Sequence, residues 1–253
     1  MHVNKILLAA LTFVLVGCHF AEFPDPNAMD HGQLPDAAVM QKNIQNAYST
    51  LDQRVAKGDI TPERRDELIS ELVGQFSDQI KVDEIKGEDT WRYADILRQG
   101  DRWEDAEKLY IQAVEIAESD DRRVNDSLQL ARVQAHLGKV EEAIATARST
   151  FDVKPIEKAP IMMSILYEIL PEGLGKDKDI ELAKLLEDAI DQHNQVVVDE
   201  NLDPGKVFLE ARSSHIRNAW QEVFRIYITN DARDELLKAQ ERARAMMEQT
   251  SQV

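Results

Sequence analysis

Apolar residues recur every three or four positions over most of the chain after residue 35, with polar and charged residues between them. This spacing follows the 3.6-residue period of an α-helix and predicts helices that each bury one face. The first predicted helix covers about 36–56 and ends before Gly58. Its apolar stripe consists of Met40, Ile44, Ala47, Tyr48, Leu51 and Val55.

A second helix is predicted to begin with Thr61 as its N-cap and Pro62 at its first helical position. Its apolar residues are Leu68, Leu72, Phe76 and Ile80. The same period continues to the end of the chain and predicts further helix pairs. We expect pairs over about 36–81, 88–118, 122–152, 159–198 and 206–248. The valines at 196–198 are compatible with a short strand, but their position favours the end of a helix.

Composition agrees with an all-helical body. Only 6% of the residues are aromatic and the chain has 10 glycines, which disfavours a β-sandwich or barrel. The formal charge is −17, so the surface repels phosphate backbones and anionic headgroups. We therefore expect no nucleic-acid partner.

The clearest internal pattern lies between Trp91 and Pro155, where small residues stand at regular positions in two successive helix pairs. The first unit contains Ala94, Leu97, Trp103, Ala106, Tyr110 and Ala113. The second contains Leu130, Ala131, Gly138, Ala143 and Pro155. This pattern resembles the tetratricopeptide repeat (TPR), in which small residues stand where the paired helices touch. Ala106 and Ala143 lie a few positions farther apart than the roughly 34 residues of an uninterrupted array, which implies an insertion near 119–121.

The resemblance implies a TPR-like solenoid of helical hairpins over 36–250, with a concave face formed by the first helix of each unit. It places Glu88, Asn125 and Ala135 on this face, together with the candidate peptide-binding residues. These candidates are Trp91, Asp95, Arg98, Gln99, Leu128, Arg132 and His136. Such a groove suits an apolar anchor flanked by acidic groups. Two other interpretations stay open: Trp91 packs against the preceding hairpin, and the two arginines form ordinary surface ion pairs.

The N-terminus has the features of a lipoprotein signal. Lys5 follows a short polar start, and the apolar core 6–16 is too short to span a bilayer core of about 30 Å as a helix. The sequence around Cys18 resembles the bacterial lipobox, which implies cleavage of a signal peptide at 1–17 and acylation of Cys18, with palmitate-type chains. Residues 18–35 read as a flexible tether. The resemblance and His19, in place of a retention aspartate, imply an outer-membrane anchor facing the periplasm.

No catalytic, cofactor or metal motif stands out. The metal motif HExxH and the nucleophile motif GxSxG are absent, and His136, His193 and His215 are isolated in the sequence. His31 beside Asp30 has no second ligand in view. The glycine-rich loop 171–177 departs from the phosphate-loop spacing, so we interpret it as a turn.

These observations leave two functional hypotheses. The first is a membrane-anchored protein-interaction scaffold or assembly factor of the bacterial cell envelope, with an unknown protein or peptide client. The alternative is a lipoprotein enzyme or small-molecule binder, with a pocket between divergent repeats and 171–177 at its rim. A shallow open groove favours the first hypothesis. A deep pocket that holds carboxylates or a histidine of shifted pKa favours the second.

Overall fold

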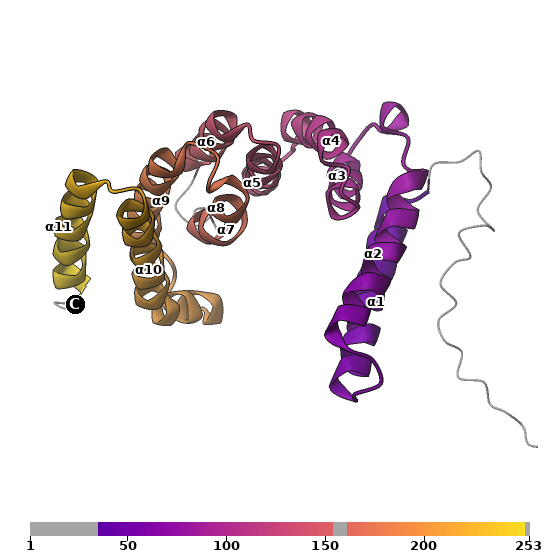
Figure 1. Cartoon of the computed structure of the whole chain (residues 1–253), viewed down its shortest axis with the longest axis horizontal. Helices are drawn as coiled ribbons and strands as arrows, with labels where there is room; N and C mark the ends of the chain where they lie inside the picture. The colour runs from indigo at the N-terminus through magenta and orange to yellow at the C-terminus, as the bar shows by residue number, and fades with distance from the viewer. Residues whose placement is uncertain (1–34, 154–160, 251–253) are drawn as a thin grey trace, which may run out of the picture. The chain divides into compact units, whose positions relative to one another are not determined.

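The computed structural model describes residues 35–153 and 161–250 (Figure 1). Within these ranges every regular element is helical and no strand occurs, which confirms the all-α prediction. None of the helices described there is long and apolar enough to cross a membrane. The signal peptide, Cys18, the tether, His31 and Pro155 lie outside the described residues.

Helix α1 (Ala37–Ala56) begins after Asp36, close to the predicted start, and α2 (Pro62–Gln79) begins after its predicted N-cap, Thr61. The Asp36 carboxylate accepts the backbone N–H of Val39 at 2.9 Å, and the Thr61 hydroxyl accepts that of Arg64 at 3.2 Å. These bonds satisfy backbone donors that the first turn of a helix leaves free. The helix starts therefore follow directly from the local sequence.

The buried faces of these helices differ in part from the expected stripes. Tyr48 of α1 is exposed, whereas Met40, Ile44 and Ala47 are buried. In α2 the buried apolar positions include Ile69 and Val73, and the predicted Leu68 and Leu72 are only half-buried. The buried face of α2 is thus centred about one residue later than the pattern suggested, because α2 packs against both α1 and α3.

A 3₁₀ turn, η1 (Val82–Glu84), leads to the central helices. These are α3 (Thr90–Gln99), α4 (Trp103–Ile116), α5 (Asp120–His136) and α6 (Val140–Arg148), followed by the 3₁₀ turn η2 (Ser149–Asp152). Successive helices of this group pack against one another, α3 with α4, α4 with α5 and α5 with α6 (Figure 1). Gly138, at the turn between α5 and α6, has a φ of 78°, a left-handed conformation that glycine adopts without strain.

The small residues of the repeat pattern lie where these helices pack. Ala94, Ala106, Ala131 and Ala143 are all 0% exposed. An alanine at such a position lets two helix backbones approach closely, and a larger side chain has no room.

We expect replacement of Ala106 or Ala143 by leucine to overpack these helix contacts and lower the free energy of unfolding by roughly 1–3 kcal/mol. Thermal or urea unfolding followed by circular dichroism measures the loss. Ala145, on the exposed face of α6, provides a matched control, because Ala145→Leu adds the same volume in solvent. Equal stability of all three variants would contradict the close-contact assignment.

The C-terminal part begins with one helical stretch made of α7 (Ile161–Ser164), the π-helical turn η4 (Ile165–Ile169) and α8 (Leu170–Gly173). It continues with α9 (Asp179–Asn194), α10 (Asp203–Thr229) and α11 (Arg233–Thr250). Helix α9 ends before the valines at 196–198, which are in neither helix nor strand. Helix α10 begins just before Pro204, because the first turn of a helix tolerates proline.

A polar network joins the last three helices. The Tyr227 hydroxyl of α10 donates to the Glu187 carboxylate of α9 at 2.5 Å, and Arg242 of α11 pairs with the same carboxylate. Arg242 also contacts Asp191 at 2.6 Å. Burial raises the pKa of Glu187, so its charge depends on these donors for compensation.

Buried apolar residues form two clusters among the described helices, and α5 contributes to both. Leu130 and Val133 belong to the cluster of α1 to α4. Val124, Leu128 and Ala131 belong to the cluster that extends through α11. Helix α5 is therefore apolar on more than one side, unlike a helix on the surface of a single core.

Candidate functional site

A polar cavity of about 250 Å³ lies between α3 and α5, and we call it the α3–α5 groove. Helix α3 supplies Trp91, Asp95 and Arg98. The remaining lining residues are Tyr110, Arg122, Asn125, Asp126, Gln129, Arg132 and Glu168. Residues 122, 125, 126, 129 and 132 recur at helical spacing, so one face of α5 forms a wall of the groove.

Trp91 is half-buried at the groove and belongs to neither apolar cluster. The guanidinium carbon of Arg122 lies 3.6 Å from the centre of its ring, and that of Arg92 lies 4.3 Å from it. Both distances fall within the range of cation–π attraction. The ring is thus held by two cations on the protein itself.

Arg122 also binds Asp126, one helical turn later on α5. Its Nε donates to the Asp126 carboxylate at 2.8 Å, and Nη2 makes a second bond to the same group. Asp126 is only 1% exposed. Burial raises the pKa of Asp126, while the hydrogen bonds and charge of Arg122 act in the opposite direction.

On α3, one carboxylate organises its neighbours. Asp95 accepts hydrogen bonds from Arg98 at 2.6 Å and from the Gln99 amide at 2.9 Å. The side chain of Arg98 is only 14% exposed. The ion pair foreseen as an alternative does form, but it lies largely below the surface, so removal of Arg98 would also disturb packing.

The last two predicted groove residues on α5 meet a different carboxylate. His136 Nδ1 lies 2.8 Å from Glu172 of α8, and Arg132 lies 3.7 Å from the same side chain. The His136 ring also stacks on Trp103 with 3.6 Å between ring centres. His136 is therefore bound by neighbouring side chains outside the groove lining.

The structure places the predicted residues in two groups. Trp91, Asp95, Arg98 and Arg132 line the groove together. Gln99 and His136 are outside its lining, and Leu128 is 3% exposed within an apolar cluster. The assignment of Leu128 to the exposed face needs correction, because α5 is covered on the side that carries this residue. Ala135, at 0% exposure, is covered in the same way.

Sequence reasoning missed several residues of the groove. Arg122, Asp126 and Gln129 continue the stripe of Asn125 and Arg132, so the helical phase of α5 contained the signal. Glu168 is different. It lies on the π-helical turn η4, whose place beside α5 depends on packing between distant segments.

A second cavity of about 440 Å³ adjoins the groove at the turn between α4 and α5, and we call it the turn cavity. Its lining includes Glu88, Arg92 and Glu118. Trp91, Arg122 and Asp126 line both the turn cavity and the groove. These three side chains therefore form a partition between two adjoining hollows.

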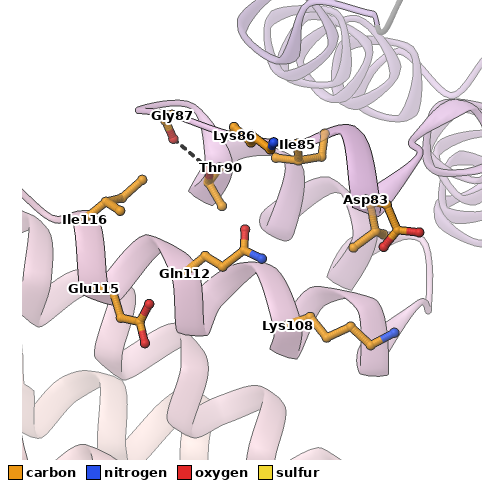
Figure 2. Close-up of a pocket in the computed structure, with 10 residues that line it drawn as sticks. Asp83, Ile85, Lys86, Gly87, Thr90, Lys108, Gln112, Glu115 and Ile116 are labelled. Atoms are coloured by element: carbon orange, nitrogen blue, oxygen red, sulfur yellow. Dashed lines mark hydrogen bonds between the residues drawn. The ribbon is translucent and has the colours of Figure 1, made fainter.

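A third cavity of about 550 Å³, the α4 cleft, lies between the loop before α3 and the outer side of α4 (Figure 2). The Thr90 hydroxyl donates to the Gly87 carbonyl at 2.7 Å and fixes the end of the loop. Ile85 and Ile116 provide apolar walls, and Ile116 also lines the turn cavity. The lining of the cleft has no pairing of a nucleophile with a base.

The glycine-rich loop that was considered as a pocket rim has a structural role. Lys176 Nζ donates to the carbonyls of Ala135 and His136 at 2.8 and 2.6 Å. A lysine at this position stabilises the C-terminal end of α5, where carbonyls lack helical partners. The residues 171–177 line none of the three cavities described above.

Within the described part of the chain, no group of three or more His, Cys, Asp or Glu side chains is arranged to hold a metal ion. Comparison with protein-family models, curated proteins and solved structures finds no match to this chain. The geometry of the groove and its neighbouring cavities is therefore the evidence for a function.

Proposed function

We propose that this protein is a cell-envelope lipoprotein that holds a segment of another protein in the α3–α5 groove and so acts as an interaction scaffold or assembly factor. Acyl chains on Cys18 tether it to the outer membrane, on the periplasmic side. The alanines at the contacts of α3 to α6 support a TPR-like arrangement of these helices.

The observation that carries this proposal is the form of the site. Trp91 lies at the boundary of two adjoining cavities whose linings come from successive helices and are rich in charged side chains. Both cavities are open to solvent, which suits an extended chain better than an enclosed small molecule. The buried Asp126 has a raised pKa, but Arg122 binds it directly, which favours a structural role for this carboxylate.

Site-specific photocrosslinking in living cells tests the proposal. A photoreactive amino acid is introduced at Asn125, which is exposed and lines the groove, and in a separate variant at Lys184, which is exposed on α9. We expect a discrete protein adduct from position 125 and none from position 184. Addition of Trp91→Ala to the first variant is expected to reduce the adduct strongly, because a buried aromatic contact anchors protein interfaces.

The control at position 184 shows whether crosslinking is specific to the groove. Adducts at both positions in equal yield would indicate random collisions and would contradict a client site in the groove. Absence of an adduct at Asn125, with normal amounts of folded protein, would also contradict it.

A further inference from the structure

Given that the groove binds a client segment, we infer that this segment is basic and lies extended across the α3–α5 groove and the turn cavity. This inference rests on the proposed function. It replaces the expectation of acidic groups beside an apolar anchor, because the structure shows how the charges of the two cavities are already paired.

Each arginine that lines the two cavities already has a carboxylate partner. Arg92 contacts Asp89 at 2.8 Å, and Arg98 contacts Asp95 at 2.6 Å. The other two pairs are Arg122 with Asp126 and Arg132 with Glu172. An acidic client would have to compete with these internal carboxylates for every guanidinium group, in a protein whose formal charge is −17.

Three further carboxylates line the cavities and are not paired with a cation among the described residues. Glu88 and Glu118 line the turn cavity and Glu168 lines the groove. None of the three forms an ion pair with another described residue. Glu168 accepts only the Gln129 amide, at 2.7 Å. These glutamates come from the loop before α3, the turn before α5 and the π-helical turn η4, so they are distributed along the path.

The apolar surface beside Trp91 suits the methylene groups of a basic side chain. Arg92 and Arg122 already lie over the Trp91 ring, but the turn cavity beside it is also lined by the exposed Ile116, and lysine and arginine pack their methylene groups on such apolar surface while their charged ends reach acceptors. A lysine or arginine that packs on Ile116 would lie close to the glutamates of the turn cavity. Charge complementarity of this kind selects partners and speeds their encounter.

Unpartnered polar atoms point to a peptide rather than a simple cation. Gln129 Oε1 is buried without a donor, and Nε of Arg98 and of Arg132 is buried without an acceptor among the described residues. An extended main chain carries both the donors and the acceptors that these atoms lack, whereas a simple cation carries no acceptor for the two arginines. The occupant is therefore an extended peptide segment that carries several lysines or arginines.

The test measures binding of short fluorescent peptides to the full-length protein by anisotropy. One peptide alternates lysine with alanine, and two others carry glutamine or glutamate in place of lysine. We expect the lysine peptide to bind at least tenfold more tightly than the glutamine peptide. The glutamate peptide is expected not to bind. Raising the salt concentration is expected to weaken the lysine complex, because exposed charges are screened.

A charge-matched pair of variants locates the effect. The first combines Glu88→Gln, Glu118→Gln and Glu168→Gln. The control combines Glu200→Gln, Glu210→Gln and Glu241→Gln, which changes the net charge equally at exposed positions outside the cavities. We expect the first variant to lose about tenfold in affinity for the lysine peptide, and the control to lose less than threefold.

Equal losses in the two variants would show that only the overall charge attracts the peptide, and would overturn the inference. Preference for the glutamate peptide, or failure of all three peptides to bind, would overturn it as well. None of these peptide-binding results bears on whether a client protein crosslinks at position 125. The proposed function is judged by that adduct, so failure of one proposal is distinguishable from failure of the other.

Discussion

Replacement of Arg122 by alanine is expected to lower the free energy of unfolding by about 3–5 kcal/mol, because it leaves the carboxylate of Asp126 buried without its partner. Asp126 is 1% exposed and accepts two hydrogen bonds from Arg122, its only ion-pair partner among the described residues. Urea unfolding at neutral pH measures the loss. Removal of the same arginine also takes away the cation beside Trp91.

The neighbouring Arg123 provides the control for this prediction. It contacts Asp120 at 2.8 Å, but both side chains of this pair are more than 40% exposed. Exposed ion pairs contribute about 0–1 kcal/mol, so Arg123→Ala is expected to have little effect. Similar stability of Arg122→Ala and Arg123→Ala would contradict a structural role for the buried pair.

The loss in Arg122→Ala is expected to depend on pH. Burial raises the pKa of Asp126, and the opposing effect of Arg122 is absent in the variant, so this pKa rises further. A carboxyl whose pKa is higher in the folded protein than in the unfolded chain contributes stability when protonated, and loses that contribution as pH rises through the folded pKa. The stability of Arg122→Ala relative to Arg123→Ala is therefore expected to improve as the pH is lowered from 7 toward 5. A constant difference would contradict this account.

Cys18→Ser is expected to abolish membrane anchoring. Cys18 is the only cysteine in the chain, so no other thiol can carry the acyl chains. Each buried methylene contributes about 0.8 kcal/mol to membrane binding, and two or three chains hold a protein at a bilayer essentially permanently. Fractionation of cells should show the serine variant uncleaved or soluble, whereas the original protein stays with the membranes until detergent is added.

His19→Ser is a suitable control for this experiment, because it alters the neighbouring residue and keeps the thiol. We expect this variant to remain in the membrane fraction at mature size. A Cys18→Ser protein that is also cleaved and detergent-dependent would contradict the lipoprotein hypothesis.

The sequence predicted the helices well where a local signal controls the structure. Asp36, Thr61 and Pro62 mark helix starts through bonds and backbone preferences within one turn. The valines at 196–198 were less informative, because α9 ends at Asn194 and Gln195 caps it, before the valines begin. Apolar spacing locates a helix more accurately than it locates the helix terminus.

The groove was predictable only in part, for a physical reason. The TPR resemblance identified Trp91 and Arg132, but it also selected Leu128, which is covered by neighbouring helices. The repeat pattern assumes that a helix buries one face against a single core. Helix α5 departs from this, because more than half of its residues are buried. The pairing of Arg132 with Glu172 of α8 depends on contacts between distant segments, which residue spacing does not record.

Because α5 belongs to two apolar clusters, genetic recombination can exchange this helix less freely than others. Repeat proteins often gain or lose whole units, because each unit contacts only its neighbours. A crossover that removed α5 here would expose the surfaces that Leu130 and Leu128 cover in different clusters. The incoming helix would need apolar residues on both corresponding sides, so α5 is harder to exchange than a helix that contributes to one cluster only.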